Sequence, residues 1–513
     1  MKPPTKLTAT SATDNSVALE WERPTDSTGV LGYQVRWRLK GTSNWVNARM
    51  RPQAVLTGLQ PNTDYEFDVM AVGRGTFSLS ATIAARTEPP PSTGEDDEGT
   101  TAFRIADMME RFGVNTFSSV VPDANVWGSW PADYTSTSVV AAIRWLTSSS
   151  GLRMNVREFY YANGRPWQIA WCRQVHEATD ALFTIAIGAN GSPADATALA
   201  AVADSVNSEN WLAAIEGINE PNNDFGFGPI NQDLVVGAQM ELDKAGDVDL
   251  RVMTPSVVFG LPHPGGWITP GYLSFAQRDA VLAHSDMYNA HVYPPSHPDA
   301  PDGSSYPGAM ADIMAELGTI YLGKPMAITE WHPTLYNTQG HKLDPAYDCY
   351  YAPAMILDAF RFGAWGVFWF ALFDYGTEYL SGLFPKSGGA DPRPVAWTIR
   401  AMYDLTGDYG ADKHTFTPGK LNYTVENLPF TGRHMLFQNS AGRYFLYVWN
   451  TIETPGGDAA SITVRFSAHA MHHVAVFEIS DVDAPARVRL ARESVSEISI
   501  PLRGSVHLFQ IDY

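Results

Sequence analysis

Two kinds of hydrophobic patterning divide the chain into three stretches. From residue 3 to residue 87, apolar and polar positions alternate and turn-forming residues recur roughly every 8 to 12 positions, which is typical of an antiparallel β-sandwich. From 103 to about 409, short continuous apolar runs alternate with helical patterns, as βα units require. Alternation returns from 410 to 513 and predicts a second all-β sandwich.

The central stretch contains eight short apolar runs that fit buried parallel strands. Each run is rich in β-branched and aliphatic residues, and polar chemistry begins where the run ends. Eight strands with intervening helices, for example at 311–322 and 352–362, predict a (β/α)₈ TIM barrel, whose functional residues lie at the carboxyl ends of the strands. The predicted strands are 114–120, 152–159, 181–188, 212–219, 250–258, 286–293, 325–329 and 366–372.

A change of composition marks the boundary before the barrel. Residues 88–101, EPPPSTGEDDEGTT, are first Pro-rich and then acidic, which is typical of a solvated linker. The predicted organisation is therefore a sandwich at 1–87, a linker at 88–101, a barrel at 102–409 and a C-terminal β-sandwich at 410–513.

Two of the apolar runs end abruptly in a carboxylate. Residues 211–223, WLAAIEGINEPNN, place Glu220 at the end of the fourth predicted strand, and residues 324–332, KPMAITEWH, place Glu330 at the end of the seventh. Cleavage of a glycosidic bond requires such a pair, because one carboxyl group protonates the leaving oxygen while the other attacks or stabilises the oxocarbenium-like centre. Either glutamate alone could simply begin a solvated loop, but the two motifs together favour catalysis.

These motifs resemble those of the clan A glycoside hydrolases, with families 5 and 39 the most similar. The resemblance covers residues 104–409 and rests on Asn219-Glu220-Pro221 and on Glu330 followed by Trp331. It implies a retaining, double-displacement hydrolase in which Glu220 is the general acid/base and Glu330 the nucleophile. It also implies that Asn219 hydrogen-bonds the sugar 2-hydroxyl.

The same resemblance suggests further residues of the site. Tyr293 is expected to hydrogen-bond the nucleophile, and His291, on the same strand face by period two, to line the cleft. Arg157 is expected to pair with the nucleophile and favour its charged form, with Arg153 as the alternative match. Trp369, in the eighth predicted strand, is expected to form the floor of the subsite where the bond breaks.

Trp331 is the tryptophan that we expect to stack on a sugar, because it directly follows the predicted nucleophile. No second site competes with the two glutamates for the chemistry: His472 and His473 would point to opposite faces of a strand, so a shared metal ion is not expected there. We predict no metal and no cofactor.

The N-terminal stretch resembles a fibronectin type III module. Residues 59–65, LQPNTDY, look like the tyrosine corner of such modules, and Trp21 is the expected core tryptophan. These modules seldom catalyse, so a spacer or docking role is favoured over sugar binding.

Charge narrows the class of substrate. The 513-residue chain carries 35 Lys and Arg against 55 Asp and Glu, a formal net charge of −20. Long-range repulsion argues against nucleic acid and strongly anionic polymers, whereas neutral glycans remain suitable. Two cysteines suggest neither a disulfide framework nor a zinc site.

No apolar run reaches the length of a membrane span, and the N-terminus does not resemble a signal peptide. We therefore expect an extracellular protein whose signal peptide has been removed or that is exported by another route, or one carried on a particle such as a phage tail. The predicted function is hydrolysis of a neutral oligo- or polysaccharide by a monomeric enzyme. Two alternatives remain open: a non-catalytic glycan-binding or adhesive protein on a barrel scaffold, and a transglycosylase.

Overall fold

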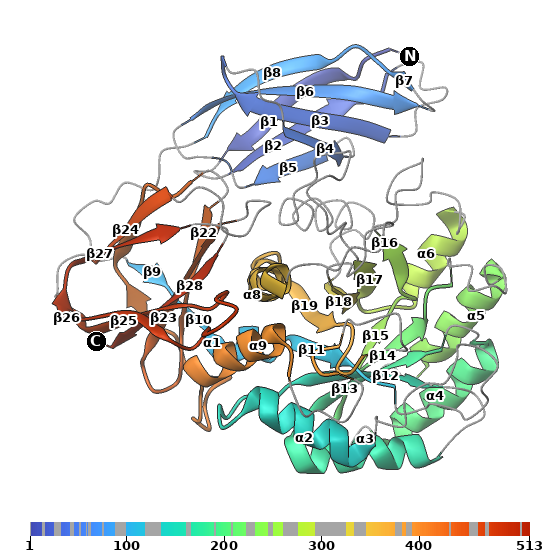
Figure 1. The fold of residues 1–513 in the computed structure, drawn as a ribbon. Helices are drawn as coiled ribbons and strands as arrows, with labels where there is room; N and C mark the ends of the chain where they lie inside the picture. Colours follow the sequence, from blue (N-terminus) through green and yellow to red (C-terminus); the bar gives the residue numbers. More distant parts are fainter. Residues whose placement is uncertain are drawn as a thin grey trace. The chain divides into compact units, whose positions relative to one another are not determined.

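The chain forms two compact units: Met1–Glu98 belong to the first, and Gly99–Met310 with Lys324–Tyr513 form the second. The fold was obtained as a computed structural model (Figure 1). It describes residues 2–12, 16–24, 32–41, 46–50, 53–57, 59, 63–73, 76–87, 99–117, 135–160, 166–188, 191–206, 209–221, 231–244, 250–259, 275–292, 325–332, 345–374, 382–385, 392–429, 432–450, 460–466, 471–502 and 505–512.

The first unit is an antiparallel β-sandwich, as its alternating pattern predicts. One sheet has the strand order β1-β2-β5, and the other has β4-β3-β6-β7 with β8 also paired to β6. Trp21 is buried in the core and contacts Tyr33 edge-on, with ring centroids 5.5 Å apart. The strands are β1 (Thr5–Ala12), β2 (Ser16–Glu22), β3 (Gly32–Leu39), β4 (Val46–Met50), β5 (Gln53–Thr57), β6 (Asp64–Gly73), β7 (Thr76–Phe77) and β8 (Ala81–Arg86).

The second unit contains the predicted barrel, a parallel sheet in the order β15-β14-β13-β12-β11-β19-β18-β17-β16 (Figure 1). An additional parallel bridge links Met253 of β15 to Met287, the residue before β17, and so closes the sheet. The described side chains of its strands are almost entirely buried, which explains their continuous apolar sequence. The strands are β11 (Phe112–Asn115), β12 (Asn155–Tyr160), β13 (Leu182–Ile187), β14 (Leu212–Ile218), β15 (Arg251–Met253), β16 (Val257–Phe259), β17 (Tyr288–Val292), β18 (Met326–Trp331) and β19 (Ala364–Trp369).

The fifth barrel strand is divided in two, unlike the single strand predicted at 250–258. β15 pairs with β14 on one side, whereas β16 pairs with β17 on the other. Pro255 lies between the two segments and has no N–H to donate to a strand ladder. The interruption turns Ser256 toward the end of β14, where it contacts Glu220.

Helices cover the outside of the barrel (Figure 1), and several of them begin at recognisable capping residues. Thr135 caps α2 by accepting from Ser138 N at 3.1 Å, and Ser192 and Asp195 exchange capping bonds at the start of α4. None of the described helices is long and apolar enough to cross a membrane. They are α1 (Ile105–Met109), α2 (Ser136–Thr147), α3 (Pro166–Thr179), α4 (Pro193–Val206), α5 (Gln232–Asp243), α6 (Phe275–Ala283), α8 (Pro345–Arg361) and α9 (Pro394–Leu405).

Two helix predictions can be compared with these bounds. The helix expected at 352–362 is the second half of α8, which begins earlier, at Pro345. The helix expected at 311–322 lies outside the described residues. Cys172 and Cys349 are both buried, and burial raises the pKa of Cys172 well above its usual value.

The C-terminal part of the second unit is a β-sandwich that borrows two strands from the region before the barrel. β9 (Thr100–Thr101) pairs with β20 (Lys420–Leu421), and β10 (Phe103–Arg104) pairs in parallel with β22 (Gly432–Gln438). The larger sheet has the order β10-β22-β23-β28-β25-β26, and the smaller has β21-β24-β27. The other strands are β21 (Tyr423–Glu426), β23 (Tyr444–Asn450), β24 (Ala460–Phe466), β25 (Met471–Glu478), β26 (Val488–Val495), β27 (Glu497–Leu502) and β28 (Val506–Asp512).

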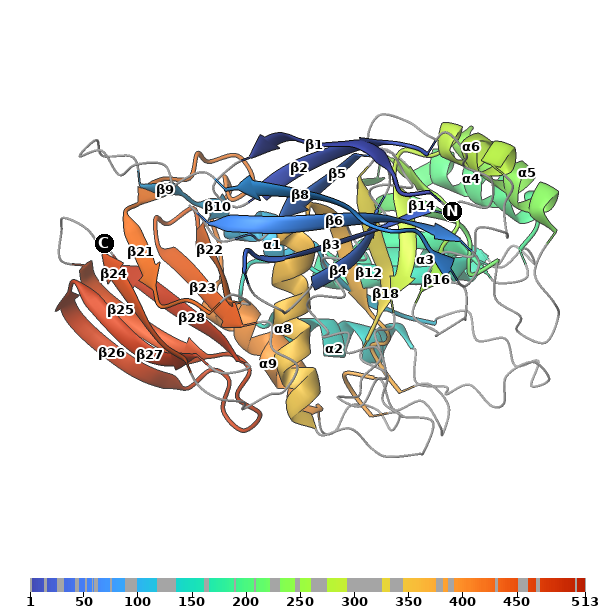
Figure 2. The same ribbon diagram turned by 90° about the horizontal axis from the view of Figure 1, so that it is seen from above.

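Barrel and C-terminal sandwich pack directly on one another. Helix α8 contacts both β19 of the barrel and β28 of the sandwich (Figure 2). The Tyr350 hydroxyl donates to the Asn450 carbonyl, and the Gln510 side chain donates to the Leu405 carbonyl. These hydrogen bonds join elements distant in sequence, so the sandwich supports the outer helices of the barrel.

A buried histidine makes the stability of this sandwich depend on pH. His507 is only 5% exposed, and burial, with a smaller contribution from Arg489, lowers its pKa from 6.5 to about 4. The unfolded chain therefore binds a proton between pH 6.5 and 4 that the folded chain does not, so stability falls as the pH drops through this window. The loss should reach about 3 kcal/mol.

Chemical denaturation at several pH values should measure this effect. The His507→Gln variant should lose less stability than the wild type between pH 6.5 and 4, because it has no imidazole to protonate. An equal pH dependence in both proteins would contradict the assignment.

Candidate active site

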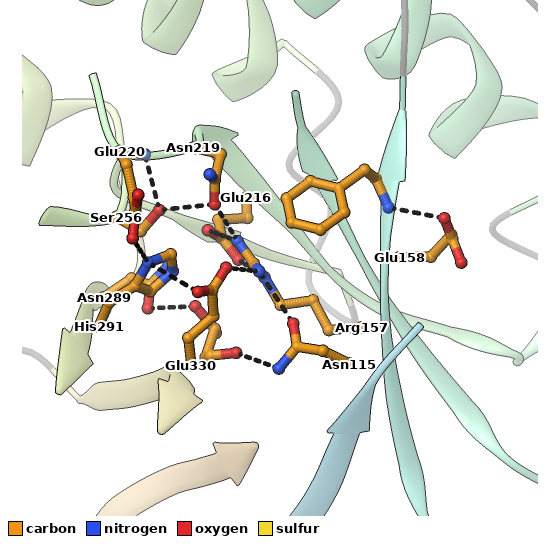
Figure 3. Close-up of polar contacts among 12 residues, drawn as sticks. Asn115, Arg157, Glu158, Glu216, Asn219, Glu220, Ser256, Asn289, His291 and Glu330 are labelled. Atoms are coloured by element: carbon orange, nitrogen blue, oxygen red, sulfur yellow. Dashed lines mark hydrogen bonds and ion pairs between the residues drawn. The ribbon is translucent and has the colours of Figure 1, made fainter. Parts of the chain in front are cut away.

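The barrel brings the predicted catalytic residues together at the carboxyl ends of its strands (Figure 3). The two glutamates come from strands that are far apart in sequence, and neighbouring strands place His291 beside Glu330 in register. The contributing elements are β11 for Asn115, β12 for Arg157, the end of β14 for Asn219 and Glu220, β17 for His291 and β18 for Glu330.

Glu330 is held by a cation. Its Oε1 atom lies 2.7 Å from Nη1 of Arg157, and both side chains are buried. This ion pair stabilises the ionised form of Glu330. Arg157, rather than Arg153, is thus the arginine that pairs with this glutamate; Arg153 instead contacts Glu110 at 2.7 Å.

Glu220 lies at a tight turn directly after β14. Its φ of 45° is in the left-handed region, which costs a non-glycine residue about 1 kcal/mol. The backbone N–H donates to Ser256 Oγ at 3.3 Å, which helps to fix this conformation. The turn directs the carboxyl group to His291, whose Nδ1 lies 2.7 Å from Glu220 Oε1.

His291 bridges the two glutamates. The same Nδ1 that contacts Glu220 lies 3.4 Å from Glu330 Oε2. Its Nε2 has no hydrogen-bonding partner among the described residues. We therefore assign the imidazole proton to Nδ1, where two carboxyl groups can accept it. One oxygen of each glutamate and a nitrogen of His291 all lie within 4.8 Å of one another.

This trio also meets the minimum geometry for a metal site, but its surroundings do not favour a metal ion. Metal-bound histidines usually donate their second ring nitrogen to a neighbouring acceptor, and His291 Nε2 has no such partner among the described residues. Arg157 already places a positive charge 2.7 Å from Glu330, which disfavours a second cation. The arrangement fits proton transfer better than metal binding.

Arg157 connects most of the site. It donates to both oxygens of Glu216, to Asn115 Oδ1 at 3.0 Å and to Asn219 Oδ1 at 2.8 Å, in addition to Glu330 (Figure 3). Burial alone would lower its pKa, but the two carboxylates raise the pKa above its ordinary value. Arg157 is therefore a permanent cation beneath the two glutamates.

The two predicted tryptophans are not placed where a sugar could reach them. Trp331 and Trp369 are 0% and 1% exposed and pack edge to face, with centroids 4.8 Å apart. The prediction that Trp331 stacks on a substrate is therefore wrong for this structure. Trp369, which was predicted to form the floor of the subsite, is buried as well. The next residue, Phe370, is partly exposed and stacks on His332. Tyr293 lies outside the described residues.

Sequence reasoning missed two residues of the site. Glu216 is a fully buried carboxylate in the middle of β14, and its charge within the apolar run LAAIEGI was a readable signal. Ser256 had no comparable signal, because its position depends on the interruption of the fifth strand.

Comparison with known proteins identifies the N-terminal unit. Residues 2–85 match the family model of the fibronectin type III domain. They are a fibronectin type III domain. Chitinase Chi52 of Paenibacillus xylanexedens is 32% identical over 134 residues, which cover 23% of this chain and 25% of that protein. The chain thus spans about a quarter of the length of the curated relatives that it matches.

The fold of the chain resembles those of solved glycoside hydrolases. A family 39 glycoside hydrolase from Bacteroides cellulosilyticus WH2 is 13% identical, with a TM-score of 0.51, and the match covers 99% of this chain and 100% of that one. A glucosidase from Croceicoccus marinus is 12% identical, also with a TM-score of 0.51, over 81% of this chain and 97% of that one. The predicted clan A resemblance is therefore confirmed at the level of the fold.

Proposed function

We propose that the protein is a retaining glycoside hydrolase that cleaves a neutral glycan with Glu330 as nucleophile and Glu220 as general acid/base. The observation that carries the proposal is the approach of the two carboxyl groups, whose nearest described oxygens lie within 4.8 Å. Retaining enzymes need carboxyl groups about 5–5.5 Å apart, whereas inverting enzymes separate them by about 6.5–9.5 Å to admit a water molecule.

In the first step, Glu330 attacks the anomeric carbon of the sugar. Oε1 is held by Arg157, so we assign the attack to Oε2. A bond forms between this oxygen and the anomeric carbon while the bond to the leaving oxygen breaks, and protonated Glu220 donates its proton to that oxygen. Because His291 contacts Glu220 Oε1, we assign the transferred proton to Oε2. The products are a glycosyl-enzyme and a released alcohol.

In the second step, a water molecule releases the sugar. Glu220, now a carboxylate, removes a proton from water while the water oxygen bonds to the anomeric carbon and the bond to Glu330 breaks. The negative charge of free Glu330 favours the protonated form of Glu220 before the next cycle. His291 Nδ1–H stabilises the charge on whichever carboxylate is ionised.

Two neighbouring residues fit roles in sugar binding. Asn219 directs Oδ1 to Arg157, which leaves its amide N–H groups to donate to a sugar hydroxyl oxygen, as the predicted 2-hydroxyl contact requires. Phe370 has a partly exposed ring at the end of β19, and we assign to it the floor that the sequence placed at Trp369.

The substrate class follows from charge. With a net charge of −20, the chain would repel anionic polymers, so a neutral oligo- or polysaccharide is the proposed substrate. We infer an extracellular or particle-associated location, because an extracellular polysaccharide would be accessible only there. The chitinase and glucosidase names belong to the relatives, and a panel that includes chitin fragments and glucosides should identify the sugar.

The test is the configuration of the first product. When an active glycoside is found in such a panel, ¹H NMR during the first minutes of hydrolysis should show the anomer of the substrate, because two displacements restore the configuration. The opposite anomer would reject Glu330 as nucleophile. Binding without turnover would favour the adhesive alternative, and transfer to an excess of acceptor sugar would favour a transglycosylase.

A further inference from the structure

Glu216 has no part in the proton and glycosyl transfers above, yet it forms two short hydrogen bonds with Arg157. Oε2 lies 2.7 Å from Nε, and Oε1 lies 2.6 Å from Nη2. Both side chains are completely buried. A buried carboxylate is stable only with such pairing, and the two parallel hydrogen bonds fix the plane of the guanidinium group.

The remaining donors of Arg157 are then aimed at the site. Nη1 donates to Glu330 at 2.7 Å and to Asn115 at 3.0 Å, and the second hydrogen of Nη2 is directed to Asn219 at 2.8 Å. A guanidinium group has five N–H donors, and all five have acceptors here (Figure 3). No donor can reach a new partner unless an existing hydrogen bond breaks.

We propose that Glu216 is a positioning residue for glycosyl transfer, acting through Arg157 on the orientation and charge of Glu330. This inference rests on the proposed function. One cation serves two carboxylates, so Glu330 receives only part of the stabilisation that Arg157 can supply. The shared charge keeps Glu330 ionised without making it a poor nucleophile.

The charges around Glu330 predict the direction in which the pH dependence of activity should move when Glu216 is changed. Among the described residues, the charged and titratable groups that face Glu330 are Arg157 from β12, His291 from β17 and Glu220 from the end of β14. Without the negative charge of Glu216, Arg157 would be balanced by Glu330 alone and would stabilise the ionised form of Glu330 more strongly. Glu330 should then ionise at lower pH and attack more slowly.

The experiment measures kcat and kcat/KM against pH for an activated aryl glycoside. In Glu216→Gln, the acidic limb of kcat/KM should move down by about one pH unit. The maximal kcat should fall about tenfold or more, because the guanidinium is no longer fixed. The matched control is Glu158→Gln. Glu158 lies on β12, is also a buried carboxylate, and accepts hydrogen bonds from the Thr116 hydroxyl and the Phe159 backbone N–H. Its acidic limb should stay in place.

Glu216→Asp provides a second arm if Glu216→Gln does not fold. The aspartate keeps the charge but is one methylene shorter, so its acidic limb should stay near that of the wild type while kcat falls. Two results would contradict the proposal and show that Glu216 has a structural role only. One is a downward shift of the acidic limb in Glu216→Asp. The other is an acidic limb that stays in place in Glu216→Gln while the melting temperature falls. No turnover by the wild type on any glycoside would instead overturn the proposed function, and this inference with it.

Discussion

Glu330→Ala should abolish turnover of every substrate, whereas Glu220→Ala should retain the first step on substrates with a good leaving group. Removal of the nucleophile prevents formation of the glycosyl-enzyme whatever the leaving group, and we expect kcat to fall by at least about 10⁴-fold. Without Glu220, an aryl glycoside that needs little protonation should still react, and the glycosyl-enzyme should accumulate because no base activates water.

Azide separates the two roles, because it is a small nucleophile that needs no general base. Added to Glu220→Ala, it should restore turnover and give a glycosyl azide of retained configuration. Added to Glu330→Ala, it should enter the empty nucleophile position and give the inverted product. The reverse stereochemistry would exchange the two labels. Glu209→Ala is the control, since this exposed carboxylate pairs with Arg173 on the surface.

Arg157→Met should be the most destabilising substitution near the site. It leaves Glu216 and Glu330 buried without their cation, and the loss of one partner of a buried pair costs about 3–5 kcal/mol. Activity should be lost as well, because Glu330 is no longer kept ionised and oriented. The denaturant concentration at the midpoint of unfolding and the slope of the transition together give the loss of unfolding free energy.

A double variant and a surface control make this result specific. Arg157→Met combined with Glu216→Leu removes a buried cation and a buried anion together, so part of the stability should return while activity stays lost. Arg173→Met breaks an exposed pair with Glu209 and should cost about 1 kcal/mol or less. Equal effects of Arg157→Met and Arg173→Met would contradict the buried network.

The barrel was predictable from sequence because each of its strands is buried on both faces. Continuous apolar runs such as LAAIEGI therefore mark strands clearly, and polar residues mark their ends. Glu220 and Glu330 could be placed together for the same reason, since parallel strands end at one side of the sheet. The split at Pro255 was visible as a residue type, but its effect on Ser256 depends on pairing with two different neighbours.

The error at Trp331 has a simple physical cause. Successive side chains of a strand point to opposite faces, so Trp331 must point away from the site if Glu330 points into it. The tryptophan then packs against Trp369 in the surrounding core. By the same period of two, Glu216 shares a face with the end of β14, which is why a charge buried in that run belongs to the site.

The two short strands that precede the barrel also determine when the second unit can be completed during synthesis. Phe103 on β10 pairs with Phe437 on β22, and the Arg104 side chain donates to the Phe416 carbonyl 312 residues later. The first residues of this unit to leave the ribosome can therefore pair only after residues more than 300 positions later have been synthesised. The described strands of the fibronectin type III domain, β1 to β8, pair only with one another, so its two sheets can form while the remainder is still being translated. A shortened gene that begins after residue 104 would lack an edge strand of the C-terminal sheet.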